Sequence, residues 1–196
     1  MINVNDFRKA AYDIDPIYIK RWSPRSFAKK DVSEKTLNSL FEAARWAPSA
    51  ANIQPWRYIY AKTAEDKECF MSFIKKGNIP WCKHAPVLIA IVSRRHWPKG
   101  DDVNPTHAFD TGTSWGFLAL EAARKGLIAH AMGGFYREKA KEVLNLPDNY
   151  DVHAIVALGY QGHLDELEEQ FHDRETPSTR KPIEEFTFEG KFSSKE

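Results

Sequence analysis

Two arginines and a serine near the N-terminus have the spacing of an anion-binding loop. Arg21 and Arg25 are four residues apart, and Ser23 lies between them. Guanidinium groups bind phosphate oxygens in bidentate fashion, and hydroxyl and backbone N–H groups can satisfy the remaining lone pairs. The segment 21–27 therefore predicts a phosphate site, although a solvated basic loop would have the same composition.

A second segment, 47–56, combines small residues, prolines and two amide side chains. Small side chains let a backbone lie flat against a ligand, and prolines fix its path. Side-chain amides offer a donor and an acceptor together, which suits the edge of a heteroaromatic ring. We expect a surface for a planar, hydrogen-bonding ligand, although Pro, Ser and Asn are also usual in an ordinary helix–strand connection.

Two later segments carry weaker signals of the same kind. Gly133 and Gly134 follow Met132, and adjacent glycines can present bare backbone N–H groups to a ligand. Near the C-terminus, Arg180 and Lys181 follow two hydroxyl residues. Taken alone, the first pattern fits any tight turn and the second any surface loop.

Side chains that catalyse reactions by themselves are not evident in this sequence. The seven histidines and the two cysteines, Cys69 and Cys82, show no metal-ligand spacing, and no Gly-x-Ser-x-Gly elbow occurs. Difficult chemistry would then fall to a bound cofactor that the protein positions. We expect no metal site.

Composition narrows the class of protein. The 196 residues carry a net charge of +1, which predicts one domain and gives no reason to expect nucleic acid or a membrane surface as partner. No apolar run is long enough to span a bilayer, and residues 1–7 do not resemble a secretory signal. With only two cysteines, a cytoplasmic location fits best.

Local patterns predict the elements that must position these segments. Ser33 is the expected cap of a helix that ends near Pro48. The other expected elements are weak helix at 4–11, strands at 56–60, 86–92 and 152–158, helices at 64–75, 106–125 and 137–146, and a loop at 94–105. Because no glycine-rich loop joins a strand to a helix, an α+β layered sheet is favoured over a dinucleotide-binding fold.

The expected helix 106–125 has apolar residues on more than one face. Its apolar stripe contains Trp115, Leu118, Ala119 and Ala122, and its stripe of small residues contains Gly112, Gly116, Ala119 and Ala123. This pattern predicts a fully buried helix, either in the core or at a dimer interface. The tail is apolar again at Ile183, Phe186 and Phe188, so we expect it to pack on its own core or on a partner.

Taken in order, these segments resemble the nitroreductase family of FMN-dependent oxidoreductases. The resemblance runs from about Tyr18 to the tail. It rests on Arg21-x-Ser23-x-Arg25, on the run from Ala43 to Trp56, on Ala85-Pro86, Gly126-Leu127, Met132-Gly133-Gly134-Phe135 and Ala157-Leu158-Gly159-Tyr160, and on Arg180-Lys181-Pro182. The run from Ala43 to Trp56 is the most specific of these motifs.

The resemblance implies a mainly antiparallel sheet flanked by helices, within a single domain 1–196. It also implies an intertwined homodimer whose tail, from about 177 to 196, packs on the partner, with FMN bound between the subunits. The implied cofactor-binding residues are Arg21, Trp22, Ser23, Arg25, Pro48, Ser49, Ala50, Asn52, Gln54, Met132, Gly133, Gly134 and Arg180. Arg21, Ser23 and Arg180 correspond to phosphate and ribityl contacts.

The remaining contacts implied by the resemblance concern the flavin ring. Arg25 matches a cation near the N1–O2 edge, where it would stabilise the negative charge of the reduced ring. Gly133 and Gly134 match backbone amides that face N5 and O4; some relatives carry Glu where this chain has Gly133, so any role of that acid is lost. Pro48, Ser49 and Ala50 match a segment that covers the partner's ring, held by Asn52 and Gln54. Asn78 is a weak candidate for a further contact at the ring edge.

The implied reaction is ping-pong hydride transfer. NADH or NADPH reduces FMN at N5 and leaves, and a small-molecule oxidant such as a nitroaromatic or a quinone takes its place. The loop 94–105, with His96, Trp97 and Pro98, could line or cover the substrate side. Three alternatives remain open: a specialised branch that consumes flavin or removes halogen, a non-catalytic flavin-binding protein, and an interaction protein without ligand.

Overall fold

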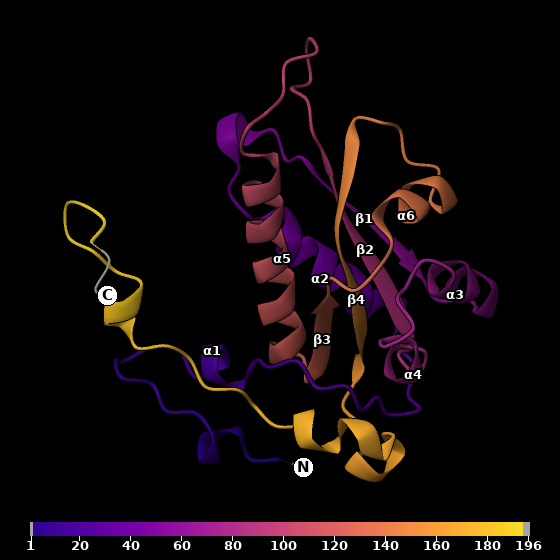
Figure 1. Ribbon diagram of the computed structural model, residues 1–196, viewed down its shortest axis with the longest axis vertical. Helices are drawn as coiled ribbons and strands as arrows, with labels where there is room; N and C mark the ends of the chain where they lie inside the picture. Colours follow the sequence, from indigo (N-terminus) through magenta and orange to yellow (C-terminus); the bar gives the residue numbers. More distant parts are fainter. Residues whose placement is uncertain (1, 194–196) are drawn as a thin grey trace.

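The computed structural model describes residues 2–193, which form an antiparallel sheet between two layers of helices (Figure 1). The strands are β1 (Trp56–Ala61), β2 (Val87–Arg94), β3 (Leu127–Met132) and β4 (Tyr150–Tyr160), in the spatial order β1-β2-β4-β3. Every neighbouring pair is antiparallel. The expected α+β architecture is confirmed. No helix among the described residues is long and apolar enough to cross a membrane.

Alternate residues of β2 and β4 supply two separate cores, because successive side chains of a strand point to opposite faces. On one face, Val87 and Ile89 pack with Leu40 of α2 (Glu34–Arg45) and Leu118 of α5 (His107–Arg124). The other face carries α3 (Ala64–Met71), α4 (Ile79–Cys82) and α6 (Arg137–Val143). Phe70, Trp81 and Ala140 anchor these three helices there.

Local signals account for most element boundaries. The Ser33 hydroxyl accepts a hydrogen bond from Thr36 N and begins α2, and the Thr63 hydroxyl caps α3 in the same way through Asp66 N. Gly126, at φ +73°, takes the left-handed turn between α5 and β3. All of the strands and long helices expected from the sequence are present.

Several expected boundaries were wrong. The helix expected at 64–75 ends at Met71, because Ile74 instead pairs with Phe135 in a β-bridge. The helix expected at 137–146 ends at Val143, and the loop 94–105 is partly a hairpin closed by a bridge between His96 and Val103. At the N-terminus only Val4–Asp6 (η1) is helical, as a 3₁₀ turn.

Helix α5 is covered on one side only. Leu118, Ala119 and Ala122 are buried against the sheet and α2, whereas Phe109 is 77% exposed and Phe117 41% exposed. Within the single chain α5 is therefore not fully buried, so the expectation of a core helix is wrong, whereas burial at a dimer interface stays a prediction. Two short helices, α1 (Ile17–Lys20) and η2 (Ala50–Asn52), lie near opposite ends of α5 (Figure 1).

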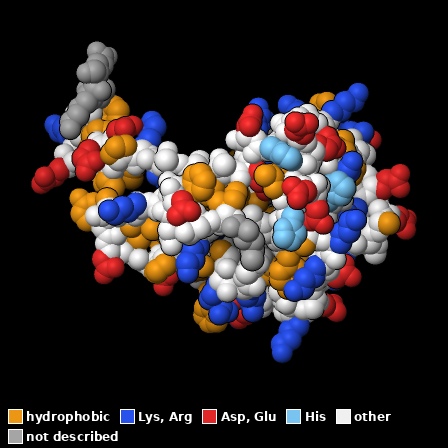
Figure 2. All heavy atoms as spheres, turned by 90° about the horizontal axis from the view of Figure 1, so that it is seen from below, with side chains coloured by type: hydrophobic (Ala, Val, Ile, Leu, Met, Phe, Trp, Pro, Cys, Tyr) orange, Lys and Arg blue, Asp and Glu red, His pale blue; other side chains and the backbone are white. Residues whose placement is uncertain are grey.

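Beyond β4 the chain forms three 3₁₀ turns, η3 (Leu164–Glu166), η4 (Glu169–Arg174) and η5 (Ile183–Glu185), and then an arm. Figure 2 shows this arm projecting from the body with apolar side chains on its surface. Phe186 and Phe192 are 60% and 78% exposed. The apolar residues of the tail thus do not pack on the core of their own chain.

Candidate functional site

Three arginines from distant parts of the chain meet at the end of α1. Arg8 donates through Nη1 to the Arg21 carbonyl at 2.9 Å and through Nε to the Ser178 carbonyl at 2.7 Å. Arg180 donates to the Ser178 hydroxyl at 3.0 Å, and Arg21 donates to the Ser23 hydroxyl at 3.3 Å. The N-terminal segment, the loop 21–27 and the C-terminal segment are therefore joined here.

The cluster is electrostatically unbalanced. Burial lowers the pKa of Arg8, and repulsion from Arg180 and Arg21 lowers it further. The pKa of Arg21 is lowered by burial and then by Arg180. Among residues 2–193, none of the three guanidinium groups forms an ion pair with a carboxylate. A polyvalent anion such as phosphate would neutralise this group of cations and accept hydrogen bonds from it.

A hollow of about 380 Å³ opens beside the cluster. Its wall combines the polar groups Arg21 and Ser23 with small or apolar residues of α5 and β3, namely Trp115, Gly116, Ala119, Leu120 and Ala131. Small residues at the wall leave room for a flat ligand close to the backbone. The larger groove between α1, α2 and α5, of about 670 Å³, is lined by Ile17, Phe117 and their neighbours and holds none of the predicted site residues.

Gly133 and Gly134 follow β3 directly and lie next to the segment before α4. The Asn78 side-chain amide donates to the Gly134 carbonyl at 3.2 Å, and Lys75 N donates to the same oxygen at 2.9 Å. A Cβ at Gly134 would overlap the Asn78 amide nitrogen, so any larger residue there would displace that amide. The structure thus brings Asn78, the weak candidate from the sequence, to the glycine pair.

Two predicted site residues are largely buried. Trp22 is 7% exposed and Met132 is 5% exposed, so their side chains belong mainly to the core. The residues next to each of them in the chain are less buried, so the main chains of Trp22 and Met132 lie nearer the surface than their side chains do. Arg25 is half-buried, its guanidinium lies 5.9 Å from the Trp81 ring, and burial lowers its pKa.

The segment 47–56 has a strained backbone held by its own polar groups. Ala51, Asn52 and Gln54 have positive φ values of 48°, 55° and 53°. The Ser49 hydroxyl accepts from Gln54 N at 3.0 Å, and the Gln54 amide donates to the Asn52 carbonyl and side-chain oxygen, both at 3.1 Å. The expected role of Asn52 and Gln54 in holding this loop agrees with these bonds.

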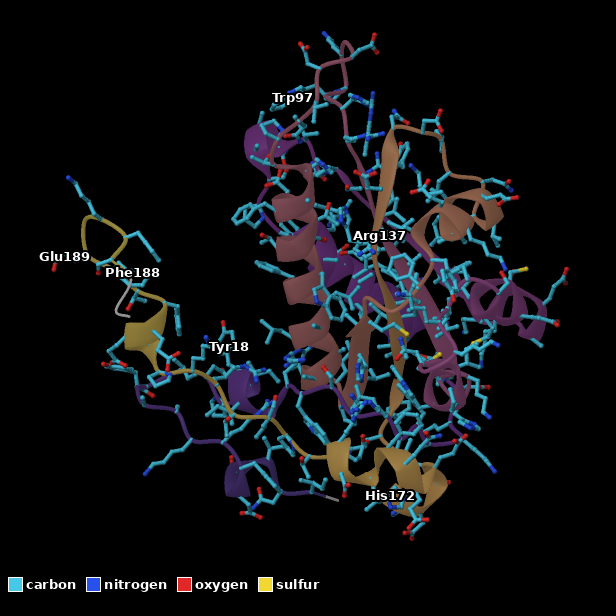
Figure 3. All side chains as sticks on the ribbon, in the orientation of Figure 1. Tyr18, Trp97, Arg137, His172, Phe188 and Glu189 are labelled. Atoms are coloured by element: carbon cyan, nitrogen blue, oxygen red, sulfur yellow. The ribbon has the colours of Figure 1, made fainter. Side chains whose placement is uncertain are left out.

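The loop is fastened to the start of α5 by a buried carboxylate. Asp110, 4% exposed, accepts from Ala50 N at 3.2 Å and from the Thr106 hydroxyl at 3.0 Å. The hollow beside Arg21 and Ser23, in contrast, is lined by α5 residues between Trp115 and Leu120, five to ten residues further along the helix, which is about 8–15 Å at 1.5 Å per residue. The two halves of the predicted site therefore lie apart within one chain. Trp97 and Tyr18 mark the two ends of α5 in Figure 3.

The model of the nitroreductase family matches residues 18–77 and 61–160, which together make up more than half of the chain. The chain belongs to the nitroreductase family. A crystal structure described as an oxidoreductase containing FMN superposes with a TM-score of 0.93 at 39% identity, covering 100% of both chains.

Two relatives in the family agree with this assignment. A protein of Streptomyces coelicolor, provisionally named an NADH dehydrogenase or NAD(P)H nitroreductase, is 35% identical over 129 residues. That match covers 56% of this chain and 64% of the relative, so the chain spans under two thirds of it. An NADH dehydrogenase of Thermus thermophilus is 27% identical, with 85% of this chain and 90% of that protein covered. The predicted family is confirmed, the names of these relatives agree with the predicted oxidoreductase class, and the FMN-containing structural relative agrees with the predicted cofactor.

Sequence reasoning missed Arg8, Asp110 and Glu175 in this chain. Arg8 completes the arginine cluster, Asp110 fastens the loop 47–56, and Glu175 bonds the backbone of Arg25 and Ser26. None belongs to a local motif, because each acts on a segment far away in the sequence. Among residues 2–193, no group of three or more His, Cys, Asp or Glu side chains is placed to hold a metal ion.

Proposed function

We propose that this chain is an FMN-dependent oxidoreductase that passes hydride from NADH or NADPH to small acceptors such as nitroaromatics or quinones. The observation that carries the proposal is the uncompensated cluster of Arg8, Arg21 and Arg180 beside a hollow with small walls. That pairing of a phosphate site with a neighbouring hollow lined by small residues fits a flavin mononucleotide. The family and its FMN-containing structural relative support the same cofactor.

The residues present match the parts of the cofactor. Arg21, Arg180 and the Ser23 hydroxyl would hold the phosphate, and the walls formed by Gly116, Ala119 and Ala131 would accept the flat ring. Met132, Gly133 and Gly134 would supply backbone contacts at the ring edge, with the main chain of Trp22 contributing at the opposite end. Asn78, whose side chain bonds the Gly134 carbonyl, is placed to add an amide at the same ring edge as the glycine pair.

When bound, FMN supplies the hydride-accepting and hydride-donating atom, N5. Arg25 would lie at the N1–O2 edge, where a fixed cation favours negative charge on the ring. The nicotinamide and the acceptor would occupy the same open face in turn, which gives ping-pong kinetics. The hairpin that carries Trp97 stands at the end of α5 and would border that face (Figure 3). Unchanged kinetics in Trp97→Ala for every accepted oxidant would contradict this placement.

A homodimer would complete the site. Pro48, Ser49 and Ala50 lie beside the first turn of α5, while Ser23 and the hollow lie further along the helix. Two copies related by a two-fold axis, with their α5 helices antiparallel along the uncovered face, would place each loop over the other copy's hollow. The exposed phenylalanines of α5 and the arm from about 177 onward would then be covered by the partner.

A cytoplasmic location remains part of the proposal, since both cysteines are free thiols.

The proposal is tested by the spectrum of the purified protein. We expect a yellow protein whose visible flavin bands bleach anaerobically on addition of NADH or NADPH and return on addition of a nitroaromatic or a quinone. A flavin that binds but is not bleached would identify a non-catalytic flavin protein. Colourless protein that stays colourless after incubation with FMN would refute the proposal.

A further inference from the structure

Arg25 is held at two points by two consecutive residues of the C-terminal segment. Its guanidinium Nη1 donates to the Arg174 carbonyl at 3.0 Å. Its backbone N donates to the two carboxylate oxygens of Glu175 at 2.8 and 2.9 Å, and Ser26 N donates to one of them at 2.9 Å. The side chain and the backbone of Arg25 are therefore both fixed by one dipeptide.

The Glu175 carboxylate is an unusual group to find in this place. It is 3% exposed, and among residues 2–193 it forms no ion pair with a lysine or arginine side chain. A buried charge is costly unless hydrogen bonds compensate it. Here the compensation comes from the backbone N–H groups of Arg25 and Ser26, so the carboxylate and the loop stabilise each other.

The dipeptide is itself rigidly attached to the body. Phe171 of η4 is 7% exposed in the core, and Glu175 N donates to the His172 carbonyl at 3.0 Å. The loop is also held beyond Arg25, since the Ser26 hydroxyl donates to the His163 carbonyl and Gly162 N donates to the Ser26 carbonyl. In Figure 3, His172 marks the position of η4 below the sheet. Arg25 is thus anchored to a fixed support on both sides.

We propose that Glu175 is a positioning residue which, with the Arg174 carbonyl, fixes Arg25 at the flavin edge before the cofactor binds. This inference rests on the proposed function, because it takes the N1–O2 edge of FMN as the partner of Arg25. Glu175 does not touch the flavin. It acts by removing the freedom that the guanidinium would otherwise lose on binding, which is the general benefit of a preorganised site.

The direction in which one substitution changes FMN affinity and the flavin midpoint potential distinguishes positioning from simple electrostatics. Glu175→Gln removes a negative charge close to an anion-binding loop, and by charge alone it would tighten FMN binding and make the flavin easier to reduce. Loss of the clamp has the opposite effect, because a neutral Gln amide binds the two backbone N–H groups through one oxygen only and more weakly than a carboxylate does, so Arg25 is held less firmly. Weaker binding together with a more negative midpoint potential is therefore the mark of positioning.

The experiment compares Glu175→Gln with Asp173→Asn, which removes the same charge from an exposed side chain two residues away. We expect Glu175→Gln to raise the dissociation constant of FMN at least tenfold and to shift the flavin potential to more negative values. Asp173→Asn should change neither quantity. Unchanged or tighter binding in Glu175→Gln, or a more positive potential, would overturn the proposal.

Two further measurements keep the inference separate from the proposed function. In the protein without FMN, hydrogen exchange at the amides of Arg25 and Ser26 should be fast in Glu175→Gln and slow in the wild type and Asp173→Asn. This result would support the clamp even if FMN did not bind, and equal exchange in all three would overturn it.

In an Arg25→Gln background, Glu175→Gln should weaken FMN binding less than twofold, since the guanidinium through which Glu175 acts on the flavin is gone.

Loss of a cooperative melting transition in Glu175→Gln would show that Glu175 is needed for folding rather than for positioning, and the inference would fail. Glu175→Asp keeps the charge but shortens the reach by one methylene. We expect that variant to melt cooperatively and to bind FMN with an affinity between those of the wild type and Glu175→Gln.

Discussion

Arg180 lies close enough to Arg8 and Arg21 to lower the pKa of both, and no carboxylate among residues 2–193 is paired with any of the three. Hydrogen bonds to backbone carbonyls and serine hydroxyls keep them together in spite of their repulsion. A bound phosphate would remove this repulsion and accept charge-assisted hydrogen bonds. The free energy of FMN binding is therefore expected to depend strongly on each guanidinium.

We predict that Arg21→Ala and Arg180→Ala each weaken FMN binding by about 1.5–3 kcal/mol, the scale of hydrogen bonds to charged groups. Lys181→Ala is the control, because Lys181 lies next to Arg180 but its side chain is exposed and pairs with Glu185 instead. Titration of the apoprotein with FMN, followed by flavin fluorescence, measures the change. Equal affinities in all four proteins would show that the phosphate lies elsewhere.

His130 contacts the segment 21–27 and makes the stability of the protein depend on pH. Its Nδ1 donates to the Pro24 carbonyl at 2.9 Å, and its ring packs against Trp81 with centroids 4.5 Å apart. Burial lowers the pKa of His130 to about 4, and Arg25 adds to the effect. Since the ordinary value is 6.5, the stabilisation by neutral His130 is complete above pH 6.5 and is lost as the pH falls toward 4.

The expected loss is about 2–3 kcal/mol of unfolding free energy between pH 6.5 and 4, from about 1.4 kcal/mol per pKa unit. His130→Gln keeps a donor for the Pro24 carbonyl but does not titrate, so its unfolding free energy should fall less over this range. Urea unfolding at several pH values gives the comparison. Carboxylate titration affects both proteins alike, so parallel curves for the two would rule out the role of His130.

At the scale of elements, the loop 47–56 keeps a backbone that its sequence does not favour. A non-glycine residue in the left-handed region costs roughly 1–2 kcal/mol, and Ala51 has no side-chain polar group to offset this. The hydrogen bonds that Ser49, Gln54 and Asp110 form offset this strain energy. A loop held in this way can present a fixed surface to a ligand on a neighbouring molecule.

We predict that Ala51→Gly raises the unfolding free energy by about 0.5–1 kcal/mol, because relief of strain exceeds the added entropy of the unfolded chain. The same change in the helix α2, Ala43→Gly, should lower it by about 1 kcal/mol. Denaturant titrations of both variants measure the two signs. Destabilisation by both substitutions would mean that the loop is not strained at Ala51.

At the scale of the whole molecule, the sequence predicted the elements better than their contacts. Ser33, Thr63 and Gly126 are local caps, so they could be read from neighbouring residues. Glu175 reaches Arg25 across 150 positions and Arg8 reaches Ser178 across 170, and such pairs leave no local pattern. The site residues predicted from the family motif lie at two places along α5, because a motif preserves order along the chain but not distance in space.

The uncovered face of α5 provides the test of the proposed dimer. Gly112 lies on this face, and a Cβ added there meets no atom within 4 Å in the single chain. Gly112→Glu should therefore leave the monomer folded, and it favours the helix by about 0.5–1 kcal/mol. In a dimer with α5 against α5, two carboxylates would be forced into a closely packed interface.

We predict that Gly112→Glu is monomeric in sedimentation equilibrium at concentrations where the wild type is dimeric. It should also lose FMN, because the loop at Pro48 could no longer cover the other copy's hollow. Asn38→Glu adds the same charge to an exposed position of α2 and should leave both properties unchanged. If Gly112→Glu remains a dimer that retains FMN, the partner binds a different face and the loop serves its own chain or none.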